Sequence, residues 1–280
     1  MIKLYYYFLL IRPLNVFVSG LAMIISSAIL NRLNESFTIA LVASVVMILT
    51  AAANSINDVV DLEIDKINCP SRPIPSKNVS KNVALLFSFI LFVIGAILSL
   101  QLSSSAQFIS IIIAIPLMIV YSTDLKSKPL IGNIAVSLII GLSFLFCGAA
   151  FGDISPMLTP GFLAFGLTLI REIIKDIADY DGDYSARYNT YPIKYGINSS
   201  VKIVAIFSCM VCLFALLPYF NNTYNFWYLI ILVIGVELPL IGVVFLLINN
   251  PSISSAIYGS KILKFITIIG LTAIYIGSLK

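Results

Sequence analysis

Residues 36–65 read SFTIALVASVVMILTAAANSINDVVDLEID, so that a long apolar run passes directly into a row of amides and carboxylates. A helix needs about 20 predominantly apolar residues to span the hydrocarbon core of a bilayer, and residues 36–56 supply such a run. Carboxylates at a membrane boundary are costly to dehydrate unless something compensates their charge. The stretch therefore predicts a membrane-spanning helix that ends in a functional polar site.

The rest of the chain has the same apolar character. The whole chain of 280 residues is 60% hydrophobic and 11% charged, and its mean hydropathy is +1.03. Soluble domains carry about 25% charged residues, so the composition excludes an ordinary soluble protein. We expect an all-α, polytopic membrane bundle that forms a single domain over residues 1–280. The nine predicted spans are 11–31, 36–56, 82–102, 106–122, 131–151, 158–175, 200–220, 226–248 and 258–279.

Charged residues are sorted to one side of this predicted bundle. With the N-terminus inside, every lysine and arginine except Arg32 and Lys280 falls on the inner side, as the positive-inside rule requires. Most of the 13 acids fall there too, although carboxylates contribute little to that rule. We therefore expect a multi-pass protein of the cell membrane, with a polar cap on the cytoplasmic face after spans two, four and six.

Two acidic groups lie in this predicted cap. The first contains Asn57, Asp58, Asp61 and Asp65 at helical intervals, with Asn54 nearby on the same helix. Carboxylates at this spacing repel one another unless a cation binds, and Mg²⁺ prefers oxygen ligands. The alternative is a solvated helix end with ordinary lysine and arginine partners. A second acidic group, with Asp176, Asp179 and Asp183, lies at the end of span six. The predicted Mg²⁺ ligands from the two groups together are Asn57, Asp58, Asp61, Asp65, Asp176, Asp179 and Asp183.

Basic, amide and hydroxyl side chains near these groups are suited to a phosphorylated substrate. Lysine and arginine neutralise phosphate oxygens and stabilise charge that builds on a leaving diphosphate. Any single one could equally be an interfacial anchor whose charged head reaches water. The predicted substrate-binding residues are Arg12, Asn15, Asn54, Arg72, Lys77, Tyr121, Ser122, Lys126, Lys175 and Arg187. The predicted catalytic residues are Asp61, Asp65, Asp179 and Lys126.

These motifs resemble the two signatures of the UbiA superfamily of intramembrane prenyltransferases. The first signature corresponds to residues 57–65 followed by Arg-Pro-Ile-Pro at 72–75. The second corresponds to residues 179–183 followed by Thr190 and Pro192. The segments at 12–15 and 121–126 also look like features that the family has on its first and fourth spans. The resemblance covers essentially the whole chain.

The resemblance implies nine helices in a ring around a central lipid-accessible cavity with a cytoplasmic cap. It also implies a polyprenyl diphosphate donor that is bound through Mg²⁺ to both acidic groups. Residues 64–68 and 175–183 look most like the archaeal branch of the superfamily. That branch transfers a geranylgeranyl group from geranylgeranyl diphosphate to geranylgeranylglyceryl phosphate, a prenylated glycerol phosphate, and so forms the second ether bond of archaeal membrane lipids.

Two positions depart from that branch. It usually has glycine where this chain has Arg187, and arginine where this chain has Asn189. One hypothesis is that Arg187 takes over an anion-binding role from the missing arginine.

The implied reaction is metal-assisted ionisation of the diphosphate, followed by attack of a hydroxyl to form an ether. Within the superfamily, an aromatic acceptor such as a quinone or haem precursor is the alternative. An ion-coupled transporter is a more distant one, because transporters place charges near the bilayer midplane, whereas these acids gather at one face. We expect membrane lipid and no nucleic acid as further partners. The prenyl chain length, the acceptor and the catalytic base stay open.

Overall fold

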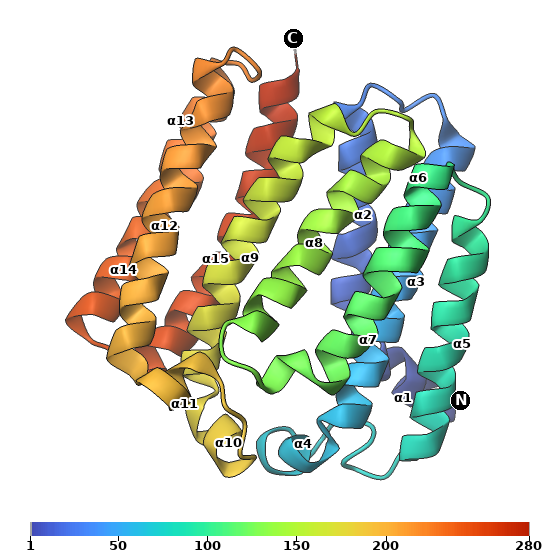
Figure 1. The fold of residues 1–280 in the computed structure, drawn as a ribbon, viewed down its shortest axis with the longest axis vertical. Helices are drawn as coiled ribbons and strands as arrows, with labels where there is room; N and C mark the ends of the chain where they lie inside the picture. The colour runs from blue at the N-terminus through green and yellow to red at the C-terminus, as the bar shows by residue number, and fades with distance from the viewer. Residues whose placement is uncertain (1, 280) are drawn as a thin grey trace. The chain divides into compact units, whose positions relative to one another are not determined.

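The computed structural model describes residues 2–279 as helices and their connections (Figure 1). Eight helices in this part of the chain are long and apolar enough to cross a membrane. A ninth span is reached if α1 (Ile2–Leu10) and α2 (Pro13–Ile29), which meet at a 57° bend, are counted as one. Each of the nine predicted spans coincides with one of these segments, so the all-α, multi-pass architecture is confirmed. Lys280, which entered the prediction of orientation, lies outside the described residues.

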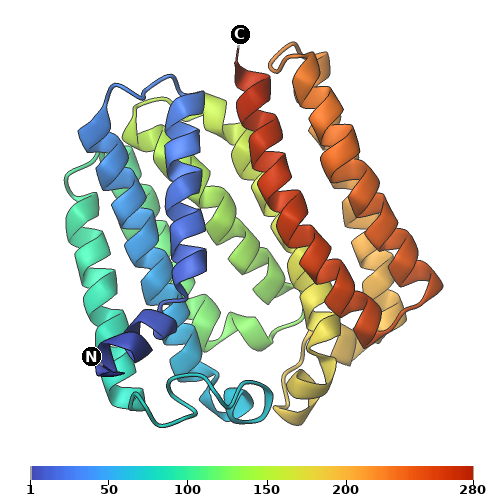
Figure 2. The ribbon, with the colours of Figure 1, turned by 180° about the vertical axis from the view of Figure 1, so that it is seen from behind.

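The described residues form two compact units, and the first ends at Lys126 but also includes Leu142–Met157. Within it α3 (Ser36–Val60) lies beside α2 and α5 (Lys81–Ser99) (Figures 1 and 2). Its further elements are α1, α4 (Leu62–Asn68), α6 (Ser104–Gln107), η1 (Phe108–Ala114), α7 (Ile115–Thr123), most of η2 (Leu125–Ser127), the second half of α8 (Ile131–Ala150) and η3 (Ser155–Met157).

The second unit comprises Ser127–Gly141 and the chain from Leu158 onward. Within it α9 packs against α12 and α15, and α15 also packs against α13. Its elements are the first half of α8, α9 (Leu158–Ala178), α10 (Tyr180–Ser185), α11 (Tyr191–Tyr195), α12 (Ile197–Phe220), α13 (Phe226–Leu232), η4 (Val233–Glu237), α14 (Leu238–Asn249) and α15 (Ile253–Ser278). That residues 1–280 form a single domain stays a prediction.

Several serines inside the apolar helices bond to a carbonyl of their own helix. The Ser55 hydroxyl donates to the carbonyl of Ala51 one turn earlier, at 2.8 Å, a bond that lets serine sit within a span without an unpaired polar atom. At the start of α5 a serine hydroxyl acts instead as acceptor, since Ser80 Oγ accepts a hydrogen bond from Val83 N and caps the helix. Buried serines are therefore compatible with the apolar spans.

Glycines allow neighbouring helices to approach closely in both units. A Cβ on Gly95 of α5 would lie 2.5 Å from Leu49 Cδ2 of α3. A Cβ on Gly166 of α9 would lie 2.6 Å from Val211 Cγ2 of α12. Small residues at such contacts favour helix association in a membrane, where burial of apolar surface adds little.

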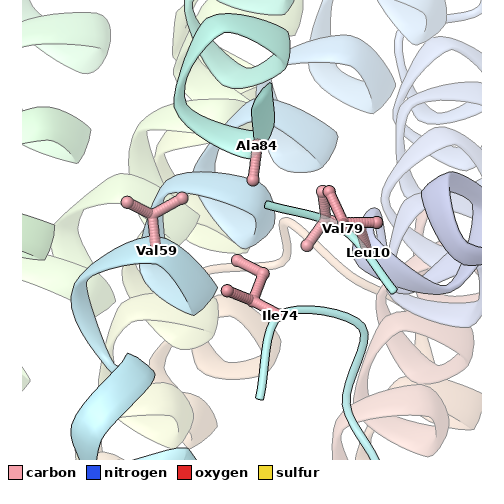
Figure 3. Packing of buried hydrophobic residues seen from close by; sticks show 5 residues of the cluster. All are labelled: Leu10, Val59, Ile74, Val79 and Ala84. Atoms are coloured by element: carbon pink, nitrogen blue, oxygen red, sulfur yellow. The ribbon is translucent and has the colours of Figure 1, made fainter. Parts of the chain in front are cut away.

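A small apolar cluster fixes the polar loop that joins α4 to α5 (Figure 3). Ile74 and Val79 of this loop are each 4% exposed. They pack with Leu10 of α1, Val59 of α3 and Ala84 of α5 (Figure 3). Burial of an isoleucine side chain contributes about 1.5–3 kcal/mol. The cluster therefore holds in place the loop that carries the Arg-Pro-Ile-Pro motif.

Candidate active site

The first acidic group lies where α3 gives way to α4, with Asp61 alone between the two helices. The helical spacing persists through this break, because Asp61 N donates to Asn57 O and Asp65 N donates to Asp61 O, each at 2.8 Å. Asp58, Asp61 and Asp65 are only 2%, 5% and 4% exposed. The structure therefore brings three carboxylates together on one buried face.

Two arginines from other parts of the first unit reach this face. Arg12 Nη2 lies 2.5 Å from Asp58 Oδ1. Arg72 Nη1 lies 2.5 Å from Asp65 Oδ2 and 3.5 Å from Asp58 Oδ1. Asp58 is thus shared between two guanidinium groups.

The remaining carboxylate, Asp61, forms an ion pair with Lys126 of η2. With this pair, the three carboxylates face three cations, and the buried group is formally neutral. Lysine and arginine partners were the alternative interpretation of the acidic motif. Such partners exist, but the carboxylates that they meet are buried in the protein rather than solvated at a helix end.

The pKa values of two groups of this site that lie outside the spans, Asp65 and Arg72, are shifted by burial and by their neighbours. Burial raises the pKa of the Asp65 carboxyl above its usual value, and the hydrogen bond and charge of Arg72 offset part of that rise. Burial disfavours the Arg72 guanidinium as well, but the charges of Asp58 and Asp65 outweigh this effect and raise its pKa. The ionised form of Asp65 therefore depends in part on Arg72, whereas the arginine remains charged in either case.

Arg12 occupies the corner between α1 and α2 in a left-handed backbone conformation, with φ 54° and ψ 73°. Residues other than glycine rarely adopt that conformation. Pro13 begins α2 directly afterwards. Asn54 Nδ2 donates to the carbonyl of Ile11 at 2.8 Å and so fixes the corner. We infer that Asn54 positions Arg12 against Asp58, a role different from the predicted contact with substrate.

The other predicted substrate-binding residues of the first unit form no ion pair with the buried carboxylates. Ser122 is buried, and its Oγ donates to the carbonyl of Met118 at 2.8 Å, so its own helix uses the hydroxyl. Tyr121 is half-buried beside it. Asn15 and Lys77 are exposed, and no ion pair joins Lys77 to a described residue.

A cavity of about 220 Å³ lies beside the paired carboxylates. It presents two guanidinium groups and a serine, a set suited to an anion. Sequence reasoning missed Ser71, for which the only signal was its position next to Arg72 in a polar loop. The described lining residues are Leu9, Arg12, Asp58, Ser71, Arg72 and Pro73.

The second acidic group lies where α9 gives way to α10 in the second unit. Asp179 separates the two helices and is exposed, and Asp183 lies within α10. Asp176, near the end of α9, accepts a hydrogen bond from Asn133 Nδ2 at 2.8 Å. Asn133 is 6% exposed at the start of α8. Sequence reasoning missed this residue, although a lone amide in an apolar span was an available signal.

Basic residues around the second group are arranged differently from those of the first. Lys175 Nζ lies 3.8 Å from Glu172 Oε2, and Arg171 Nη1 lies 3.0 Å from Glu172 Oε1. Glu172 therefore receives both cations of this helix. Arg187 follows α10 on an exposed loop.

The donor atoms of the first unit suit Mg²⁺, which takes carboxylate and amide oxygens as ligands. Asn57 Oδ1 is buried and has no hydrogen-bond partner in the described part of the chain, an arrangement that a bound cation would relieve. Within residues 2–279, no three Asp, Glu, Cys or His side chains are arranged to hold an ion. The acidic side chains of the first group instead face Arg12, Arg72 and Lys126.

Known proteins resemble this chain along nearly its whole length. The pattern of the UbiA prenyltransferase family matches residues 15–265. A digeranylgeranylglyceryl phosphate synthase from Methanosphaera stadtmanae is 36% identical over 273 residues, which cover 98% of this chain and 99% of that protein. A protein of the same name from Saccharolobus solfataricus is 39% identical over 244 residues, which cover 86% and 85% of the two chains.

Solved structures of related proteins have a similar fold to this chain. A structure described as digeranylgeranylglyceryl phosphate synthase in membranes matches with a TM-score of 0.83 and 33% identity over 99% of both chains. A UbiA homolog from Archaeoglobus fulgidus bound to DMAPP and Mg²⁺ matches with a TM-score of 0.63 over 96% of this chain and 98% of that one. At 16% identity, this second likeness concerns the fold alone. With the family pattern and relatives above 30% identity along nearly the whole sequence, the chain belongs to the UbiA prenyltransferase family.

Proposed function

We propose that this chain transfers a geranylgeranyl group from geranylgeranyl diphosphate to the free hydroxyl of geranylgeranylglyceryl phosphate. The product contains the second ether bond of an archaeal membrane lipid. The observation that carries the proposal is the buried row of carboxylates at the α3–α4 break, in which each carboxylate is paired with a basic side chain. The shared name of the relatives, digeranylgeranylglyceryl phosphate synthase, supports this donor and acceptor.

The metal in this proposal is Mg²⁺, which was bound to a structural neighbour of the same fold together with an allylic diphosphate. When bound, it would supply positive charge that stabilises the diphosphate as the donor C–O bond breaks. In the first unit the proposed ligands are Asn57, Asp58, Asp61 and Asp65, and in the second unit they are Asp176, Asp179 and Asp183; because one Mg²⁺ takes only a few protein ligands, we expect two or three ions.

Charge balance explains why the metal and the diphosphate should bind together. The paired group of three carboxylates and three cations is formally neutral. A divalent cation alone would make it positive, and a diphosphate alone would make it negative. We therefore expect Arg12, Arg72 and Lys126 to exchange carboxylate partners for phosphate oxygens as both ligands enter.

The chain then has three tasks in the reaction. Its basic side chains neutralise charge on the departing diphosphate. Its apolar helices exclude water from the allylic carbon, because water would otherwise react with the prenyl group in place of the acceptor. The acceptor hydroxyl attacks that carbon, the C–O bond to the diphosphate breaks, and the hydroxyl proton passes to a site carboxylate or to the departing diphosphate.

The orientation of the bundle is part of the proposal. We place the N-terminus and both acidic groups on the cytoplasmic side, because all lysines and arginines except Arg32 and Lys280 fall on that side in the nine-span arrangement. The diphosphate donor and phosphorylated acceptor would then present their charged heads to the cap while their prenyl tails remain among the apolar helices.

The test is an assay of the purified protein in detergent with Mg²⁺ and geranylgeranyl diphosphate. Geranylgeranylglyceryl phosphate and 4-hydroxybenzoate are offered as competing acceptors, and products are identified by mass. We expect a diether phosphate, which EDTA and the Asp61→Asn substitution abolish. Asp153→Asn, which changes an exposed acid next to η3, is the matched control and should retain activity. Prenylated 4-hydroxybenzoate as the main product would overturn the acceptor, and turnover that persists in EDTA would overturn the metal.

A further inference from the structure

A polar cavity of about 620 Å³ lies in the second unit beside the loop that joins α10 to α11. This loop lies between two spans, so the cavity belongs to the polar cap rather than to the apolar interior. Its described lining contains a guanidinium, an amide and several hydroxyls, and no carboxylate. The lining residues are Tyr184, Ser185, Arg187, Tyr188, Asn189 and Ile193.

Arg187 is held in this cavity by an unusual backbone conformation. Its φ is 58°, in the left-handed region that glycine favours. The position follows the C-cap of α10, where Arg187 N donates to Tyr184 O at 3.1 Å and Tyr188 N donates to Asp183 O at 2.9 Å. A side chain other than glycine persists at such a position when the surroundings determine it, and these positions cluster at functional sites.

The guanidinium of Arg187 is available to a ligand. Arg187 is exposed, and no ion pair joins it to another described residue, in contrast to the two arginines of the first acidic group. The loop itself is tied down, because Asn189 N donates to the carbonyl of Ser127 at 3.1 Å. The next residue, Thr190, is 3% exposed and its Oγ1 has no partner within the described chain. The cavity thus borders a loop that is held in place and that carries an exposed guanidinium without an ion-pair partner in the described residues.

We propose that this cavity binds the phosphate monoester of the acceptor and that Arg187 determines specificity for a phosphorylated acceptor. The inference rests on the proposed function and adds the residue that recognises the acceptor head group. A guanidinium binds phosphate through two parallel, charge-assisted hydrogen bonds, and an uncharged glycerol head offers no anionic group to accept them. An anionic headgroup of a bulk lipid has the same chemistry, so the experiment must separate these two sources.

The experiment measures KM for the donor and for the acceptor in wild type, Arg187→Gly and Arg187→Ala. Both substitutions remove the guanidinium, but glycine relieves the left-handed backbone and alanine does not. We expect both to raise the acceptor KM by about 10- to 100-fold, as for loss of a hydrogen bond to a charged group, and to leave the donor KM unchanged. Asn222→Gly, at another left-handed position (φ 55°) on the α12–α13 loop, is the matched backbone control.

Further arms identify the ligand. Unphosphorylated geranylgeranylglycerol should be a poor acceptor for wild type, and its disadvantage should largely disappear in Arg187→Gly. Glycerol 1-phosphate should compete with the acceptor in wild type only, whereas competition by phosphatidic acid alone would assign the cavity to bulk lipid and overturn the inference. An active wild type with an unchanged acceptor KM in both variants would overturn this inference alone. A wild type that makes no diether phosphate would overturn the proposed function as well.

Discussion

Replacement of Arg72 by methionine removes the cation that two buried carboxylates share. Arg72 lies 2.5 Å from Asp65 and 3.5 Å from Asp58, so the substitution reduces the compensation of both. Loss of one partner from a fully buried ion pair costs about 3–5 kcal/mol, whereas exposed pairs contribute about 0–1 kcal/mol. Because the Arg72 side chain is 31% exposed and that of Asp65 is 6% exposed, we expect an intermediate loss. The free energy of unfolding should fall by about 2–3 kcal/mol.

Thermal unfolding in detergent with EDTA measures this loss. One kcal/mol corresponds to about 2–4 °C in Tm for a chain of 150–250 residues, so a loss of about 2–3 kcal/mol should lower Tm by about 4–12 °C. Adding Asp65→Asn to Arg72→Met should restore part of the stability, because it removes an uncompensated carboxylate. Mg²⁺ should raise the Tm of Arg72→Met more than that of wild type, since the vacated oxygens become available to it.

Two results would refute this reasoning. The first is an Arg72→Met protein that unfolds at the wild-type temperature in EDTA. The second is a loss of stability that neither Asp65→Asn nor Mg²⁺ relieves, because the cause would then be lost packing rather than unpaired charge.

Three further predictions concern residues that support the site or the bundle. Asn54→Ala should raise the donor KM several-fold, because its amide fixes the α1–α2 corner; unchanged steady-state kinetics would contradict this. Asn133→Ala should lower Mg²⁺-dependent turnover and leave Tm nearly unchanged, because its amide orients Asp176. A fall in Tm that accounts for the lost turnover would indicate a purely structural role. Gly166→Ala should lower unfolding stability by about 1–3 kcal/mol through a clash, and a second substitution, Val211→Ala, should relieve it.

The sequence alone located the spans well, because the length of an apolar run is a direct consequence of bilayer thickness. The predicted span at 36–56 nevertheless stopped short of the observed end of α3 at Val60. The helix continues because its last turn carries Asp58 on a buried, compensated face. Local polarity indicates where a helix leaves the lipid, but it does not indicate where the backbone stops being helical.

Pairings within the site could not be predicted in the same way. Arg12 and Asp58 are 46 positions apart, and Lys126 and Asp61 are 65 positions apart. Helical periodicity relates residues three or four positions apart and is silent about which cation meets which carboxylate. Asn133 was missed for a related reason, since its contact with Asp176 depends on the packing of two helices rather than on a motif.

The unusual conformation of Arg187 was partly foreseeable. The branch that this chain resembles usually has glycine at this position, which was an available signal of a left-handed backbone, although only an anion-binding role was inferred from it; the structure has φ 58° there. The cavity that the loop borders could not be inferred, because it depends on how α10 ends and on the bond from Asn189 to Ser127.

Binding of a non-reactive thiodiphosphate analogue of the donor tests whether both acidic groups grip one diphosphate through shared metal. Its affinity is measured with Mg²⁺ present for wild type, Asp61→Asn, Asp179→Asn and the double variant. If the groups act as a unit, each single substitution removes most of the affinity and the double variant loses little more. Losses that simply add, or an Asp179→Asn protein that binds the analogue as tightly as wild type, would contradict the proposal.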